Sequence, residues 1–355
     1  MRYPAHGANP ATLYQQLQLE MPAQIVDLSE NVNFLGPPAS FHKVWSAIFE
    51  QIALYPHEGA EPLRSDLARH HHVLAEHVVI GNGAAEIIMA LAKRYRSKPV
   101  IIVEPSFSEY KRTLMQQHAS IQSLIVEELT SYVLPMERLK QAMIGAEAVY
   151  ICNPNNPTGV VTPRSKLLEL LQYGQQVGCE LIVDEAFMDW TDESQSVIDL
   201  VASFNNLVVL RSMTKMYSMA GVRLGYAITQ HAANLKLELP HWNVSAPSMA
   251  LGMQALQEAE FCENSRQQAT AMRTKVTHWL KEHGCTVTNS ETNYIAFRLP
   301  SCYDPTEFYF ALLKKGIVLR HTQNFVGMDG AWFRLALKEP YKMTAFQQAM
   351  EQFFR

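Results

Sequence analysis

The sequence predicts an α/β protein whose central sheet is mainly parallel and lies between helices. Three observations lead to this prediction: recurring apolar runs, polar residues directly after each run, and a different pattern near the C-terminus. The runs, which are rich in β-branched residues, occupy 100–103, 148–152, 181–183 and 207–210. Strands that are apolar throughout are typical of a parallel sheet that is covered on both faces.

Each apolar run is followed at once by polar or turn residues. These residues occupy 104–107, 153–157, 184–185 and 211–215. In open α/β sheets, ligands bind outside the carboxyl ends of the strands. We therefore expect the four segments to converge on one crevice.

The C-terminal part of the chain has the pattern of a smaller α+β domain. Strands are expected at 294–297 and 317–319, a helix at 304–315, and a closing amphipathic segment at 343–354. A long polar helix over 258–283 would link this domain to the first. The predicted organisation is an N-terminal arm that joins the small domain (1–44), a large domain (45–270) and a small C-terminal domain (271–355).

Composition excludes several classes of protein. The 355 residues carry 30 basic and 34 acidic side chains with no long run of either sign, which argues against nucleic acid as a partner. No apolar signal segment or membrane-spanning stretch is evident. The five cysteines include no Cys-x-x-Cys pair, so we expect reduced thiols, no metal site and a cytoplasmic location.

Lys215 is the strongest candidate for a chemical role. A lysine just beyond a buried strand loses hydration, which lowers the pKa of its ammonium and frees the amine to form a Schiff base. Ser212 and Arg223 flank Lys215 and suit a phosphate monoester. The alternative is a solvated loop lysine and an arginine in a structural ion pair.

Two further segments carry candidate residues. Gly83 and Ala84 open an apolar helical run, and the exposed N–H groups of such a turn can bind phosphate, although many such turns are only turns. Asp184 ends a buried strand, where a carboxylate is costly unless it meets a cation such as a protonated pyridine nitrogen. An ordinary helix-capping or turn aspartate is the alternative.

Together, four motifs have the order and spacing of a known family. They are Gly83-Ala84, the 153–159 segment Asn-Pro-Asn-Asn-Pro-Thr-Gly, Asp184-Glu185-Ala186, and Ser212-x-Thr214-Lys215 with Gly221-x-Arg223-x-Gly225. Over essentially its whole length the sequence resembles the fold-type I pyridoxal-phosphate enzymes of the class I/II aminotransferase kind. The resemblance implies a large domain with a mainly parallel sheet and a smaller α+β domain.

The resemblance also implies roles for individual residues. Lys215 would bind the cofactor covalently and later move protons, and Asp184 would pair with the pyridine nitrogen. Asn156 would donate to the 3-oxygen of the ring, and Phe107 would stack on its face. The cofactor phosphate would be held by Gly83, Ala84, Ser212 and Arg223, and by Tyr55 of a neighbouring subunit. A homodimer is therefore implied.

One position departs from the family pattern. Many aminotransferases have a tyrosine where this chain has Phe187, and its hydroxyl donates to the 3-oxygen of the cofactor. The loss of that donor counts against simple transamination.

Two branches of the family are the nearest: histidinol-phosphate aminotransferases and L-threonine-O-3-phosphate decarboxylases. The His6-Gly7 pair and the Asp-x-Ser-x-Asn-x-Asn-x-Leu-Gly element at 27–36 resemble the decarboxylases, which make the aminopropanol phosphate of cobalamin synthesis. By this resemblance the substrate, a small phosphorylated amino acid, would be bound by His6, Gly7, Asn31, Asn156, Arg320 and Arg334. The alternatives are a loose terminal histidine and a surface arginine.

A third hypothesis belongs to another class of protein. The chain could bind pyridoxal phosphate without catalysis and serve as a regulator. The intact set of Lys215, Asp184 and Arg223 argues against it.

Overall fold

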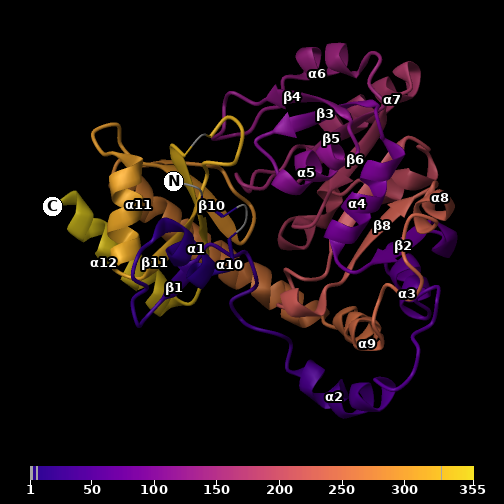
Figure 1. Cartoon of the computed structure of the whole chain (residues 1–355), viewed down its shortest axis with the longest axis horizontal. Coiled ribbons are helices and arrows are strands. Elements are labelled where there is room, and N and C mark those ends of the chain that lie inside the picture. The colour runs from indigo at the N-terminus through magenta and orange to yellow at the C-terminus, as the bar shows by residue number, and fades with distance from the viewer. Residues whose placement is uncertain (1–2, 5–6, 329) are drawn as a thin grey trace.

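A computed structural model describes residues 3–4, 7–328 and 330–355 and contains two sheets (Figure 1). The larger sheet has seven strands in the order β2-β8-β7-β6-β5-β3-β4. The strands are β2 Val78–Gly81, β3 Pro99–Glu104, β4 Ser120–Ile125, β5 Ala148–Cys152, β6 Glu180–Asp184, β7 Leu207–Ser212 and β8 Gly225–Thr229. Strand β8 runs antiparallel to both of its neighbours, β2 and β7, and the other pairs of neighbouring strands are parallel. The predicted mainly parallel sheet is confirmed, and each apolar run forms one of its strands.

Helices cover both faces of this sheet, which explains why the strands are apolar throughout. In β5, Val149 and Ile151 belong to one hydrophobic core, whereas Tyr150 and Cys152 belong to the core on the other face. The helices are α3 Leu63–His70, α4 Ala84–Arg94, α5 Ser108–Gln116, α6 Met136–Met143, α7 Arg164–Val177, α8 Ala232–Lys236 and α9 Ala246–Ala255. Helices α4, α5 and α8 pack on the face that includes Tyr150, and α3, α6, α7 and α9 pack on the opposite face.

The smaller sheet has the order β1-β11-β12-β10-β9. Its strands are β1 Val26–Leu28, β9 Thr286–Val287, β10 Tyr294–Arg298, β11 Ile317–His321 and β12 Trp332–Ala336. The N-terminal segment belongs to this sheet because β1 pairs in parallel with β11. Helices α1 Pro10–Leu17, α11 Pro305–Lys314 and α12 Pro340–Phe354 share a separate core with it.

Two helices connect or extend these parts (Figure 1). The long helix α10 Ala259–Glu282 runs between the two sheets, and α2 Ser40–Gln51 projects from the body and packs on α9. The domain boundaries at 44/45 and 270/271 stay a prediction, and both positions fall inside these helices. Short 3-10 helices occupy Ala75–His77, Met188–Trp190, Glu193–Gln195, Ile198–Ala202 and Ala220–Val222. No helix in the described residues is both long and apolar enough to cross a membrane.

A buried ion pair ties the carboxyl ends of β6 and β7 together. Arg211 Nε lies 3.0 Å from Glu185 Oε2, and Arg211 Nη1 lies 2.9 Å from Asp189 Oδ1. The Arg211 and Glu185 side chains are 2% and 0% exposed. Asp184 precedes Glu185 and Ser212 follows Arg211, so the pair fixes the two strand ends that carry these candidate residues.

Replacing Arg211 should therefore destabilise the protein. We expect Arg211→Met to lower the free energy of unfolding by about 3–5 kcal/mol, because the Glu185 carboxylate would stay buried without its partner. Denaturant unfolding followed by circular dichroism measures the change. The control is Arg69→Met, since Arg69 is 77% exposed in its pair with Asp66 and should contribute less than about 1 kcal/mol. Equal stabilities of the two variants would contradict the assignment.

Candidate active site

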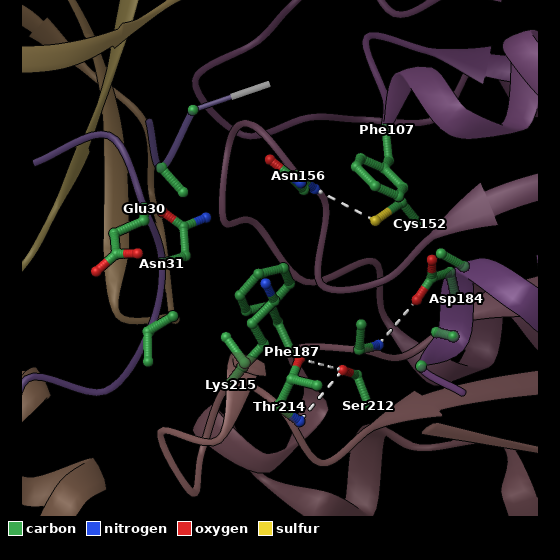
Figure 2. Close-up of a pocket in the computed structure, with 18 of the residues that line it drawn as sticks. Glu30, Asn31, Phe107, Cys152, Asn156, Asp184, Phe187, Ser212, Thr214 and Lys215 are labelled. Carbon is green, nitrogen blue, oxygen red and sulfur yellow. Dashed lines mark hydrogen bonds between the residues drawn. The ribbon is translucent and has the colours of Figure 1, made fainter. Parts of the chain in front are cut away.

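A cavity of about 320 Å³ opens at the carboxyl ends of the parallel strands, where the crevice was expected. Figure 2 shows Asp184 and Ser212 on one side of it, and Glu30 and Asn31 across from them on the N-terminal segment. The predicted site residues that line the cavity are Gly7, Asn31, Gly83, Ala84, Phe107, Asn156, Asp184, Ser212, Lys215, Arg223, Arg320 and Arg334. Segments far apart in the sequence therefore meet here.

Two predicted site residues are not among those that line the cavity. Tyr55 is 84% exposed, and its ring lies 5.1 Å from that of Trp242 in a separate surface depression. His6 lies outside the described residues, so its predicted role stays a prediction.

One end of the cavity has the features of a phosphate site. Gly83 has a φ of +79°, and a Cβ there would lie 2.7 Å from Arg223 Nη2, so only glycine lets the guanidinium approach the start of α4. A Cβ on Gly225 would lie 2.4 Å from the Ala84 nitrogen. Ser212 and Thr214 bring their hydroxyl oxygens within 2.8 Å of each other at the same end. The free N–H groups of α4, a guanidinium and hydroxyls are the donors that a phosphate needs.

Lys215 and Asp184 are ionisable groups that line the cavity, Asp184 buried and Lys215 half-buried. Burial lowers the pKa of Lys215 to about 8, and repulsion from Arg334 and Arg223 acts in the same direction. A substantial fraction of the amine is therefore neutral, and nucleophilic, near neutral pH. Burial raises the pKa of Asp184, while donors from Tyr110 and the Ala186 backbone oppose this rise.

The N-terminal element builds the opposite wall of the cavity. Asp27 Oδ1 accepts from the Ser29 backbone N–H at 2.8 Å and from its hydroxyl at 2.6 Å. The Asn31 carbonyl accepts from Asn293, and its Oδ1 is buried without a hydrogen-bond partner among the described residues. Asn33 donates its backbone N–H to the Lys215 carbonyl at 3.1 Å. The 27–36 element, which includes Asn31, is thus hydrogen-bonded to the backbone of Lys215.

Arg320 and Arg334 lie directly opposite each other on β11 and β12 and are 3% and 6% exposed. Arg334 donates to Asn156 Oδ1 at 2.6 Å and to the Ser29 carbonyl at 2.7 Å, and its Nε has no partner among the described residues. Burial lowers the pKa of Arg334 to about 10, and burial followed by repulsion from Arg334 lowers that of Arg320 to about 9. Like charges opposite each other in a sheet are destabilising, so this pair is suited to an anionic ligand.

The charged lining of the cavity is mainly basic. Lys215, Arg223, Arg320 and Arg334 face it, against the two carboxylates of Asp184 and Glu30. A ligand that carries several negative charges would balance this excess.

Asn156 and Phe107 also line the cavity, as predicted. Because Asn156 Oδ1 accepts from Arg334, its amide nitrogen is the group left to donate to a ligand oxygen. Phe187 also lines the cavity, and its ring centroid is 6.0 Å from Lys215 Nζ. Tyr294 packs edge-on against Phe187, but its hydroxyl donates to the Asn155 carbonyl.

Sequence reasoning missed four residues that belong to this site. Thr214, Glu30 and Phe325 line the cavity, and Tyr110, which is not part of its lining, donates to Asp184. Tyr110 follows Phe107 by three residues, a spacing that places both on one side of a helix start and could have identified it. Phe325 lies in a loop that shows no periodic pattern.

Comparisons with known proteins agree with this geometry. The family model described as aminotransferase class I and II matches residues 23–348. The chain is 30% identical over 349 residues to a threonine-phosphate decarboxylase of Salmonella typhimurium, covering 94% of this chain and 92% of that protein.

Two solved structures are similar in fold. A histidinol-phosphate aminotransferase from Clostridium acetobutylicum superposes with a TM-score of 0.87 at 27% identity, covering 92% of this chain and 98% of that one. A histidinol-phosphate aminotransferase from Sinorhizobium meliloti, solved in complex with pyridoxal 5'-phosphate, gives a TM-score of 0.84 at 19% identity, covering 97% and 94%.

The residues of the cavity fit pyridoxal phosphate. Donors at Gly83 and Arg223 suit its phosphate, the buried amine of Lys215 suits its aldehyde, and the Asp184 carboxylate suits its ring nitrogen. The chain therefore belongs to the class I and II aminotransferase family and has pyridoxal 5'-phosphate as its cofactor.

Proposed function

We propose that this enzyme decarboxylates L-threonine O-3-phosphate to (R)-1-amino-2-propanol phosphate and carbon dioxide, as a step of cobalamin-type biosynthesis. The observation that carries the proposal is the buried pair Arg320 and Arg334, paired in register on one wall of the cavity. A substrate with a carboxylate and a phosphate brings about three negative charges, and two guanidinium groups supply most of the opposing charge. Similarity to a threonine-phosphate decarboxylase supports the same substrate.

The cofactor would be held by the residues that the resemblance indicated. Lys215 would form the covalent link, Asp184 would face the pyridine nitrogen, and Asn156 would donate to the 3-oxygen. Phe107 would cover one ring face, and Gly83, Ala84, Ser212 and Arg223 would bind the phosphate. When bound, pyridoxal phosphate supplies an electron sink for a bond that breaks at the substrate α-carbon.

The substrate residues would decide which bond breaks. A pocket that holds the carboxylate out of the ring plane favours loss of carbon dioxide, whereas one that holds the α-hydrogen there favours transamination. Arg334, Arg320, Asn31 and Gly7 would fix the two anionic groups, with His6 as a further predicted contact. Lys215, whose pKa of about 8 lets it hold or release a proton near neutral pH, would return a proton to the α-carbon.

The second candidate is a histidinol-phosphate aminotransferase, favoured by the TM-score of 0.87 to such an enzyme. Histidinol phosphate carries no carboxylate. It would therefore neutralise less of the positive charge of Arg320 and Arg334 than threonine phosphate would. The intact set of Lys215, Asp184 and Arg223 counts against a catalytically silent regulator.

Product analysis distinguishes these functions. The protein loaded with pyridoxal phosphate is incubated with L-threonine O-phosphate, with and without an oxo-acid acceptor, and the products are identified by mass spectrometry. We expect 1-amino-2-propanol phosphate whether or not the acceptor is present. Conversion of histidinol phosphate only when an acceptor is added would identify an aminotransferase, and no reaction with either substrate would favour the regulator.

Replacing Arg334 should impair use of the phosphorylated substrate. We expect Arg334→Met to lower kcat/KM for L-threonine O-phosphate a hundredfold or more, about 3 kcal/mol, because a substrate anion would lose a buried charged partner. Steady-state kinetics measure this change, and cofactor absorbance shows that the cofactor is retained. Arg298→Met is the control, since Arg298 lies exposed on the neighbouring strand β10. An unchanged kcat/KM would rule out this role for Arg334.

We further propose that a second copy of the chain covers the exposed face of α2. Trp45, Phe49 and Ile52 have spacings of four and three residues, share one side of this helix and are 56%, 67% and 62% exposed. Tyr55 follows them, next to Trp242. Large exposed apolar patches of this kind mark interaction sites. In the family a tyrosine like Tyr55 reaches the cofactor phosphate of the neighbouring subunit, so such a homodimer would share its active sites.

A charge placed in this patch should separate the subunits. We expect Phe49→Glu to raise the dimer dissociation constant about thirtyfold or more, or ~2 kcal/mol, because a carboxylate would be buried in an apolar contact. Sedimentation velocity measures the oligomeric state. The control is Val133→Glu, because Val133 is also well exposed (65%) but lies just before α6. Helix α6 is at the opposite end of the molecule from α2 (Figure 1). A dimer that survives Phe49→Glu unchanged would place the interface elsewhere.

The five cysteines carry free thiols, four buried and Cys302 exposed. Free thiols are usual in reducing compartments, and we propose the cytoplasm as the location.

A further inference from the structure

Tyr110, which is not among the residues that line the cavity, contacts the candidate cofactor acid. Its hydroxyl donates to Asp184 Oδ2 at 2.5 Å, and the backbone N–H of Ala186 donates to Asp184 Oδ1 at 2.9 Å. Both carboxylate oxygens therefore have a fixed donor. Asp184 nevertheless lines the cavity, so its remaining lone pairs are available to a ligand there.

The fold dictates this contact. Along β6 the side chains alternate between the two faces of the sheet, and Asp184 has the same parity as Ile182, which packs in the core that contains Tyr110. Asp184 is also in register with Cys152 on β5, at the edge of that core. Tyr110, on the first turn of α5, is fully buried there. Its hydroxyl meets the one carboxylate that ends the strand.

Tyr110 also borders the residue proposed to cover the cofactor ring. Its own ring meets that of Phe107 nearly at right angles, with centroids 5.8 Å apart. The same short segment thus supplies a ring on one side of the cofactor and a hydrogen bond to the acid at its ring nitrogen. Small movements of α5 would affect both together.

We infer that Tyr110 is a positioning residue that keeps Asp184 an oriented carboxylate facing the pyridine nitrogen of pyridoxal phosphate. A buried carboxylate without donors tends to take up a proton, and a protonated Asp184 would no longer hold a proton on the ring nitrogen. The hydroxyl of Tyr110 makes Asp184 a weaker base, so the proton stays on the cofactor. The inference rests on the proposed assignment of Asp184 to the ring nitrogen.

The experiment compares Tyr110→Phe with the wild type in the holoenzyme. Nitrogen-15 NMR of a cofactor labelled at its pyridine nitrogen measures the protonated fraction, and equilibrium titration measures the cofactor dissociation constant. We expect Tyr110→Phe to lower the protonated fraction and to raise the dissociation constant about tenfold, since hydrogen bonds to charged groups are among the strongest.

Tyr150→Phe is a matched control. Tyr150 lies in the same core, its ring centroid is 5.3 Å from that of Tyr110, and its buried hydroxyl has no hydrogen-bond partner among the described residues. Its removal deletes the same atom without touching Asp184, so both readouts should stay at wild-type values.

Asp184→Asn separates a failure of this inference from a failure of the site assignment. Wild-type readouts for Tyr110→Phe together with a loss of protonation in Asp184→Asn would overturn the role of Tyr110 alone. Wild-type protonation in both variants would overturn the assignment of Asp184. If Tyr110→Phe did not fold, 3-fluorotyrosine at position 110, a stronger acid and donor, should raise the protonated fraction, and a fall or no change would overturn the inference.

Discussion

The buried ion pair between Arg211 and Glu185 is the constraint on which the site depends. It crosses from the end of β7 to the end of β6, and each partner is adjacent in sequence to a residue of the cavity: Ser212 on one strand and Asp184 on the other. A buried ion pair contributes little net stability compared with apolar packing, but its geometry is strict because either charge alone is costly. It fixes the separation of the acid from the start of the loop that carries Lys215.

In the cavity next to this ion pair, basic side chains outnumber acidic ones. Arg320 and Arg334 lie opposite each other, Arg223 packs on Gly83, and the half-buried Lys215 lines the same cavity. Burial, followed by repulsion from Arg334, lowers the pKa values of Arg320 and Lys215. A cofactor phosphate and an anionic substrate would neutralise these basic groups. Part of the binding free energy would therefore come from removing an unfavourable electrostatic interaction of the ligand-free protein.

Much of this could be predicted from the sequence, for identifiable reasons. Apolar runs in the sequence predict β3, β5, β6 and β7, and the rule that ligands bind at the carboxyl ends of strands predicts that Asp184, Ser212 and Lys215 lie together. The local pattern could not show that Tyr110 meets Asp184, because that contact depends on strand parity and on how α5 packs. Nor could it show that Arg320 faces Arg334, which depends on the register of β11 and β12. Tyr55 lies away from the cavity in a single chain, so its predicted role depends on a second subunit.

The N-terminal element links recognition of the substrate to the position of the lysine. Its Ser29 carbonyl accepts from Arg334, whereas Asn33 donates to the Lys215 carbonyl and to the Met216 carbonyl. The element begins in strand β1 of the smaller sheet, whereas the two bonds of Asn33 reach the loop after β7 of the larger sheet. A ligand that draws Arg334 and Asn31 inward therefore acts on a segment bonded to the lysine backbone. Through these hydrogen bonds, an anion bound at Arg334 would affect the position of the lysine backbone.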